Sequence, residues 1–276
     1  MIRLIINADD LGAGELTDQG IIEAYSKGVV SSASLLANGP SFASAVNQVR
    51  LSGLSIGVHL NLSEGESLTG PIAGLTNSDG RFPGKAASRS CFLTGNIDVA
   101  AVQRELFAQI EKVRKAGLQP DHLDTHQHSA LFPQITAPLI AVATESGIQK
   151  MRLSQPAQFD SACSSSPLED ELALYRQLAP AMSKKFRAAR IVTPDGLLGM
   201  PLLNRLNDQQ LRRLLTCLPD GVWELMVHPG YFDPLNSFSS PAREKELTAL
   251  TSESIRNFIQ QHDIRLINFS DLPCAC

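Results

Sequence analysis

Acidic residues and histidines stand at or just beyond the ends of short apolar segments of this chain. In chain order they are Asp9, Asp10, His59, Asp124, His126, His128 and His228. In folds built on parallel strands, the carboxyl ends of the strands gather at one edge of the sheet, and functional groups lie there. We therefore expect these side chains to meet in one site.

The residue types indicate metal-dependent hydrolysis. One carboxylate and two imidazoles can form one face of a divalent metal site and leave positions open for water and substrate. Such an ion polarises a carbonyl and lowers the pKa of its water. A second carboxylate can take that proton, and a histidine opposite can protonate a departing nitrogen. On an extended backbone, adjacent Asp9 and Asp10 would point to different sides, so one could bind the metal while the other faces the water.

Each residue taken alone also has an ordinary structural interpretation. Asp9 and Asp10 could cap the helix that follows them. His59 could be a hydrogen-bonded histidine of the core, and His228, which precedes a Pro-Gly pair, could be a turn residue. The joint placement at strand ends is what favours a site.

The other histidines differ in how specific their positions are. His126 and His128 would share one face of a strand, which makes the pair moderately specific. His122 and His262 stand in no such pattern, and we expect both to be structural.

Predicted strands and helices alternate along the whole chain. Strands are predicted near residues 4–6, 29–37, 54–62, 122–124, 151–153, 190–192, 223–227 and 265–269. Helices are predicted over 15–27, 41–50, 98–116, 134–146, 170–188, 207–217 and 241–262, and residues 63–96 and 154–170 as irregular segments. The alternation predicts a parallel sheet in an α/β fold. Because neither a linker nor a repeat is visible, we predict one catalytic domain over residues 1–276, built as a distorted barrel.

Composition excludes several classes of protein. The formal net charge is -4, and we find no basic run of the kind that binds nucleic acid. No stretch approaches the roughly 20 apolar residues of a membrane span, and we expect no signal peptide and a cytoplasmic location. The five cysteines are irregularly spaced, so we expect no disulfide framework and a frayed tail at Cys274 and Cys276. A homodimer is plausible because it is the commonest oligomer.

Four motifs carry a resemblance to a known family. The segments Asn-Ala-Asp-Asp-Leu-Gly at 7–12, Gly-Val-His-Leu at 57–60, Asp-His-Leu-Asp-Thr-His-Gln-His at 121–128 and Val-His-Pro-Gly-Tyr at 227–231 resemble those of the YdjC-like carbohydrate deacetylases. The resemblance covers nearly the whole chain. It implies a single-domain, TIM-barrel-like distorted (β/α) barrel related to the polysaccharide deacetylases. It also implies removal of the acetyl group from a small N-acetylated sugar or chitooligosaccharide.

The resemblance further implies roles for individual residues. One divalent metal ion would be held by Asp10, His59 and His126. Asp9 would be the general base, and His228 the general acid that also stabilises the oxyanion. Zinc or magnesium is expected, with manganese, cobalt and nickel open.

Supporting roles are expected for a second group of residues, either around the metal or at the substrate: Asp124, His128, Arg152, Arg243 and Glu244. Members of the family often carry a further histidine two residues past His128. This chain has Ala130 there, so any role of that histidine is missing.

Two alternatives to deacetylation stay open at the level of sequence. Hydrolysis of another bond, such as a phosphoester, would favour Arg or Lys clamps near the metal, and the motif segments supply little beyond Arg152. An inactive sugar-binding module would need aromatic platforms but no general base. Only 5% of the residues are aromatic.

Overall fold

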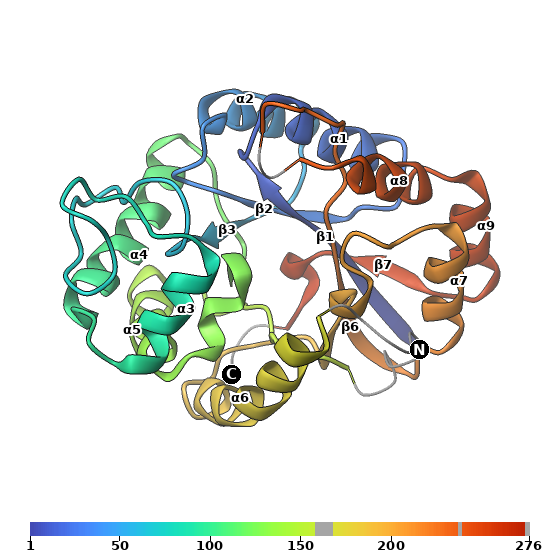
Figure 1. Cartoon of the computed structure of the whole chain (residues 1–276). Helices are drawn as coiled ribbons and strands as arrows, with labels where there is room; N and C mark the ends of the chain where they lie inside the picture. Colours follow the sequence, from blue (N-terminus) through green and yellow to red (C-terminus); the bar gives the residue numbers. More distant parts are fainter. Residues whose placement is uncertain (158–167, 237–238, 274–276) are drawn as a thin grey trace.

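The centre of the fold is one curled sheet whose paired strands all run parallel (Figure 1). This computed structural model describes residues 1–157, 168–236 and 239–273. The strands are β1 (Ile2–Leu11), β2 (Ser32–Leu35), β3 (Ile56–Leu60), β4 (Leu123–Thr125), β5 (Gly196–Leu198), β6 (Gly221–Val227) and β7 (Arg265–Ile267). Their order is β4-β3-β2-β1-β6-β5, with β7 paired to the start of β1. The long β1 therefore lies in the middle, where its apolar residues Leu4, Ile5 and Ile6 are fully buried.

Helices surround the sheet on its outer side (Figure 1). They are α1 (Glu15–Ser26), α2 (Phe42–Ser52), α3 (Lys85–Thr94), α4 (Val99–Lys115), α5 (Pro133–Ser146), α6 (Glu169–Ala188), α7 (Asp208–Thr216), α8 (Pro241–Leu250) and α9 (Glu253–Gln261). Short 3₁₀ segments cover His126–Leu131, Met200–Leu202 and Phe269–Asp271. Within the described ranges, none of the helices is both long and apolar enough to cross a membrane.

Within the described ranges, the curled sheet closes into a barrel through isolated bridges only. Residues 150–156 lie between the edge strands, with single parallel bridges from Leu123 to Met151 and from Pro156 to Leu197. The predicted α/β fold with a distorted barrel is thus confirmed. That residues 1–276 make one catalytic domain stays a prediction.

With the residues that the structure describes, the two predicted strands at 151–153 and 190–192 form only isolated bridges. Met151 donates its backbone N–H to Val192, and Arg152 donates to Leu123, but the pairing does not extend further along these segments. The regular strand β5 begins four residues later, at Gly196. A run of three apolar residues does not indicate how many backbone hydrogen bonds the segment will form with neighbouring strands.

Two helix predictions also need correction. The predicted helix at 241–262 is two helices, because Ser252 takes an extended conformation between α8 and α9. Residues 63–96 are not irregular throughout, because α3 lies within them. Helix α3 buries only Ser88 and Phe92, so its periodicity in the sequence is weak.

Candidate metal centre

A backbone irregularity in β1 places the two adjacent aspartates. Between Ala8 and Leu11 the register with β2 shifts, and Asp10 has a φ of 67°. This left-handed conformation is uncommon for a residue with a side chain, and such strain concentrates at functional sites. The expectation that an extended backbone separates Asp9 from Asp10 is therefore wrong, because it is a bulge inside the strand that re-aims Asp10.

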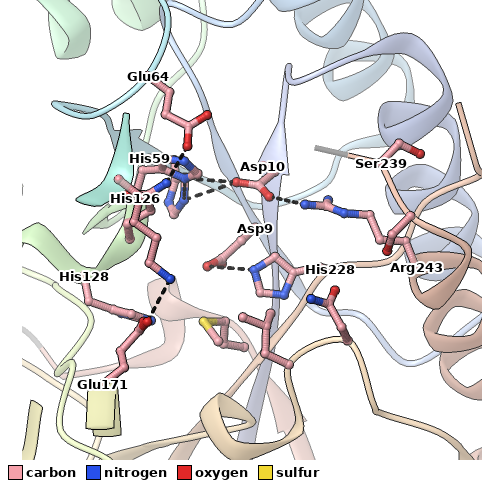
Figure 2. A pocket seen from close by; sticks show the side chains of 16 residues that line it. Asp9, Asp10, His59, Glu64, His126, His128, Glu171, His228, Ser239 and Arg243 are labelled. Carbon is pink, nitrogen blue, oxygen red and sulfur yellow. Dashed lines mark hydrogen bonds and ion pairs between the residues drawn. The ribbon is translucent and has the colours of Figure 1, made fainter. Parts of the chain in front are cut away.

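Asp10, His59 and His126 form a compact buried triangle (Figure 2). His59 comes from β3, and His126 is the first residue after β4. Asp10 Oδ1 lies 3.2 Å from His126 Nδ1 and 3.6 Å from His59 Nε2, and the two imidazole nitrogens are 3.2 Å apart. Bonds of about 2.0–2.2 Å to one tetrahedral ion place ligand atoms roughly 3.3–3.5 Å from one another. The triangle therefore fits one divalent ion.

The second nitrogen of His59 fixes the direction of its ring. His59 Nδ1 lies 2.8 Å from Asp124 Oδ1, in β4, so Nε2 faces Asp10 and His126. Burial favours the neutral imidazole, but the neighbouring Asp124 and Asp9 raise the pKa of His59 to about 9. A carboxylate behind a ligand histidine is the usual arrangement at metal sites.

Asp9 is held by Arg152 rather than by the triangle. The guanidinium contacts both oxygens of Asp9 at 2.6 Å, and also contacts Asp124 at 2.9 Å and Glu224 at 2.7 Å. Arg152 is 1% exposed, so it lies behind the site and not at a substrate. Burial opposes ionisation of Asp9, but Arg152 outweighs it and lowers the pKa of this carboxyl group.

Arg243, from α8, binds the other aspartate. Its Nη2 lies 2.6 Å from Asp10 Oδ2, and this contact outweighs burial to hold the pKa of Asp10 well below its usual range. Asp10 Oδ1 is buried and accepts no well-formed hydrogen bond from the described residues. This oxygen points into the triangle, as a ligand would.

The charges of the cluster also fit a cation. The buried carboxyl groups of Asp9, Asp10, Asp124 and Glu224 contact the guanidinium groups of Arg152 and Arg243. These carboxylates outnumber the guanidinium groups, and buried charge needs a partner. A divalent ion in the triangle would balance the excess.

His228 follows β6 and faces Asp9 across the cavity (Figure 2). Its Nε2 lies 4.0 Å from Asp9 Oδ2, and its backbone N–H donates to Glu246 at 2.7 Å. Burial lowers the pKa of His228 to about 4, although Asp10 and Asp9 act in the opposite direction. The imidazole is therefore neutral near pH 7.

The remaining predicted residues take different places. His128 lines the cavity, but away from the triangle, and its Nδ1 lies 3.3 Å from Ser154 Oγ. Burial lowers the pKa of His128 to about 3, so it stays neutral. Glu244 does not reach the cluster, because its carboxylate accepts the backbone N–H of Phe232 at 2.9 Å.

The cavity above the cluster has a volume of about 300 Å³. Besides the predicted residues, its walls contain side chains that the sequence did not single out: Glu64, Lys85, Gln127, Glu171, Leu203, Asn204, Met226, Ser239 and Ser240. Lys85 pairs with Glu171 at 2.9 Å, and Gln127 donates to Glu64 at 2.6 Å. These polar walls could bind hydroxyl groups.

Glu224 was missed although the sequence carries a signal for it. It is a charged residue within the apolar run 223–227 of β6, and it is fully buried. Charged side chains are almost never fully buried unless they are paired. A charge in a buried strand therefore points to an internal ion pair, which here is the one with Arg152.

The barrel edge joins a buried Asp–His–His triangle, which could hold a metal ion, to a second aspartate and a facing histidine. Such a set of side chains is suited to hydrolysis. The family model described as YdjC-like protein matches residues 3–261, and the chain belongs to this family.

Named relatives agree with this assignment. A carbohydrate deacetylase from Listeria welshimeri is 33% identical over 277 residues, covering 98% of this chain and 100% of its own. A carbohydrate deacetylase from Mus musculus is 30% identical, and the match covers 98% of this chain and 95% of the relative. A crystal structure from Enterococcus faecalis V583, of a protein named for cellobiose-phosphate cleavage, superposes with a TM-score of 0.75 at 28% identity, covering 98% of each chain. The prediction of a hydrolase of the deacetylase class is confirmed.

Proposed function

We propose that this protein is a metal-dependent carbohydrate N-deacetylase. It would hydrolyse the N-acetyl group of a small N-acetylated sugar or chitooligosaccharide to an amine and acetate. The observation that carries the proposal is that the triangle of Asp10, His59 and His126 opens on the same cavity as Asp9 and His228. The relatives named carbohydrate deacetylase support the substrate class.

Asp10, His59 and His126 would hold one divalent ion. When bound there, the ion would polarise the acetyl carbonyl and acidify a water molecule. Two nitrogens and one carboxylate suit zinc, and magnesium, manganese, cobalt and nickel are also candidates.

Asp9 would act as the general base. The Arg152 guanidinium keeps its carboxylate ionised, and Asn7 donates to its Oδ1 at 2.9 Å, so both oxygens have fixed positions. A carboxylate held in this way can take a proton from the attacking water without first reorganising.

His228 would serve the departing nitrogen and the oxyanion. A neutral imidazole can donate one hydrogen bond to the developing oxyanion. Because it carries no extra proton before the reaction, we propose that the proton taken up by Asp9 passes to His228 across their 4.0 Å separation and then to the amine. The water proton thus ends on the leaving nitrogen, and the hydroxyl on the acetyl carbon.

Phosphoester hydrolysis has less support. Of the cations that line the cavity, Lys85 pairs with Glu171 and Arg243 with Asp10, while Arg152 lies behind Asp9. Lys85 and Arg243 could bind a phosphate group only after these ion pairs were broken. The homodimer and the cytoplasmic location stay predictions.

The test is a substrate panel on chelator-treated protein. Zinc, magnesium, manganese, cobalt or nickel is restored, and N-acetylglucosamine, diacetylchitobiose and p-nitrophenyl phosphate are offered. We expect release of acetate from at least one sugar and no release of phosphate. Phosphate release without acetate would favour the phosphoester alternative. Sugar binding without any release would favour a binding module.

A further inference from the structure

His122, which the sequence predicts to be a structural histidine, lies in a buried chain of polar contacts behind the proposed metal centre. Its Nδ1 is 2.6 Å from Asp121 Oδ1, and its Nε2 is 3.3 Å from Ser34 Oγ. Ser34 in turn donates to Asp124 Oδ2 at 2.9 Å, and Asp124 holds His59. The chain thus runs from Asp121 to a proposed metal ligand.

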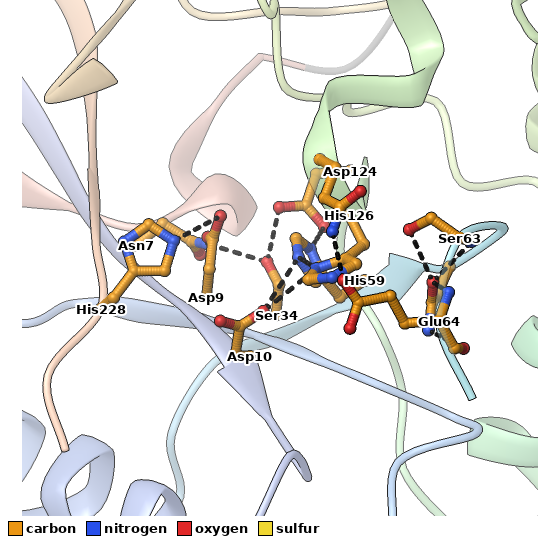
Figure 3. A network of polar contacts seen from close by, with 12 residues as sticks. Asn7, Asp9, Asp10, Ser34, His59, Ser63, Glu64, Asp124, His126 and His228 are labelled. Carbon is orange, nitrogen blue, oxygen red and sulfur yellow. Dashed lines mark hydrogen bonds and ion pairs between the residues drawn. The ribbon is translucent and has the colours of Figure 1, made fainter. Parts of the chain in front are cut away.

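Ser34 is the branch point of this chain (Figure 3). Besides its contact with Asp124, its Oγ accepts from Asn7 Nδ2 at 2.8 Å, and the same amide group donates to Asp9 at 2.9 Å. One fully buried hydroxyl group therefore touches both the arm that leads to His59 and the arm that leads to Asp9. A small shift of this hydroxyl would be felt at both residues.

The hydrogen bonds at the Ser34 hydroxyl determine whether His122 Nε2 donates or accepts. A serine hydroxyl has one proton to donate and two lone pairs to accept with. Asp124 acts as an acceptor, because the same Oδ2 pairs with the Arg152 guanidinium at 2.9 Å. Ser34 therefore gives its proton to Asp124, and His122 Nε2 must donate to Ser34. Asp121 likewise accepts from Nδ1, so both ring nitrogens of His122 act as donors.

The His122 ring packs between Gly57 on one side and Phe269 on the other. A Cβ on Gly57, in β3, would lie 2.4 Å from His122 Nε2. On the other side Phe269 stacks on the ring, with centroids 3.8 Å apart and an angle of 12° between the planes. His122 is fully buried. A ring held on two faces and at both nitrogens has essentially one orientation.

We propose that His122 is a positioning residue for the metal centre. By donating to Ser34, it directs the hydroxyl proton to Asp124, and this keeps His59 Nε2 turned toward Asp10 and His126. The inference rests on the proposed function only in that His59 is a metal ligand. It concerns the affinity for the ion and can be measured without the reaction.

Two conservative variants separate this role from a merely structural one. In His122→Gln, the amide nitrogen falls near the position of Nε2 and still donates to Ser34. In His122→Asn, it falls near Nδ1 and keeps only the contact with Asp121. Both variants remove one buried hydrogen bond, so we expect similar decreases in the thermal unfolding midpoint.

The readout is the dissociation constant of Zn²⁺, measured by competition with a chromogenic chelator on metal-stripped full-length protein. We expect about tenfold weaker binding for His122→Asn, the lower end of the range for outer partners of a ligand, and binding close to wild type for His122→Gln. Equal affinities in the two variants, whether unchanged or weakened in parallel with stability, would overturn the inference.

A second pair decides the matter if the His122 variants fail to fold. Ser34→Ala should weaken zinc binding by about tenfold. Ser31→Ala is its matched control, because, among the residues that the structure describes, the Ser31 hydroxyl bonds only to the backbone of Ile6 and Ile267. Equal zinc affinity in these two variants would also contradict the proposal. A wild-type protein that binds no divalent ion would instead overturn the proposed metal-dependent function, and the inference with it.

Discussion

Asp9 and Arg152 form a bidentate ion pair inside the sheet, with Nη1 2.6 Å from Oδ2 and Nη2 2.6 Å from Oδ1. The residues are 143 positions apart in the chain. The pair locks the carboxylate beside the proposed metal ligands and keeps it ionised. Arg152 also contacts Asp124, so one guanidinium group holds both the proposed base and the partner of His59.

The variant Asp9→Asn should separate catalysis from metal binding. The amide cannot take a proton, so kcat should fall by about 10²- to 10⁴-fold, the usual contribution of a general base. Arg152 would keep Asp124 and Glu224 as partners, so the fold should persist. Steady-state acetate release and zinc affinity check this. Unchanged kcat would remove Asp9 from the mechanism.

Loss of Arg152 should be costly to stability. Arg152→Met would leave three buried carboxylates without their guanidinium partner, and breaking such a cluster costs about 3–5 kcal/mol. Urea denaturation measures the loss. The control is Arg176→Met, whose pair with Glu169 is exposed and should contribute less than about 1 kcal/mol. Similar losses for the two variants would be incompatible with a buried cluster that depends on Arg152.

Glu246 should make stability depend on pH. Burial raises its pKa to about 7 from an ordinary 4.5, although the His228 backbone and Arg243 oppose the shift. Between these values the folded state binds more protons than the unfolded state, so stability should fall as pH rises from about 4.5 to 7 and stay reduced above.

Glu246→Gln should remove this slope while keeping an acceptor for the His228 N–H. At pH 8 we expect the variant to be on the order of 1–3 kcal/mol more stable than wild type, with no gain at pH 4.5. The exposed Glu244→Gln on the same helix is the control for loss of a charge. A gain that is independent of pH would argue against a protonated Glu246.

Gly20 in α1 should position the loop that carries His228. A Cβ at Gly20 would lie 2.5 Å from Gly230 Cα, so Gly20→Ala must push this loop outward. We expect a loss of about 1–3 kcal/mol and a 10- to 100-fold decrease in kcat. Gly53→Ala is the control, because Gly53 has a φ of 72° and no atom of the described residues lies within 4 Å of an added Cβ. It should lose stability only. Full kcat in Gly20→Ala would show that the contact does not locate His228.

The sequence was sufficient to predict that the side chains of the candidate site lie close together. Parallel strands bring their carboxyl ends to one edge, so Asp10, His59 and His126 could be expected to meet although they come from three segments. The sequence was not sufficient to predict the bulge at Asp10. A left-handed φ on a non-glycine residue depends on the register between β1 and β2. Local preference alone would not choose that conformation.

The partners behind the site were harder to predict for a related reason. Arg152 lies in a segment that makes only isolated bridges with other described residues, so no periodicity in the sequence indicates which way its side chain points. Its three carboxylate partners come from β1, β4 and β6. Such a cluster is set by tertiary packing. The sequence alone predicts a structural role for His122, because its link to Asp124 passes through Ser34, which lies 88 residues away in the chain.

Acetate release after metal is restored, compared between wild type and His126→Ala, tests most directly whether the triangle holds a catalytic metal. Chelator-treated wild type should release no acetate from diacetylchitobiose and should regain activity as one equivalent of a divalent ion is added. His126→Ala removes one corner of the triangle and should neither bind the ion tightly nor regain activity. Acetate release by metal-free wild type, or equal recovery in His126→Ala, would contradict the proposal that Asp10, His59 and His126 hold a catalytic metal.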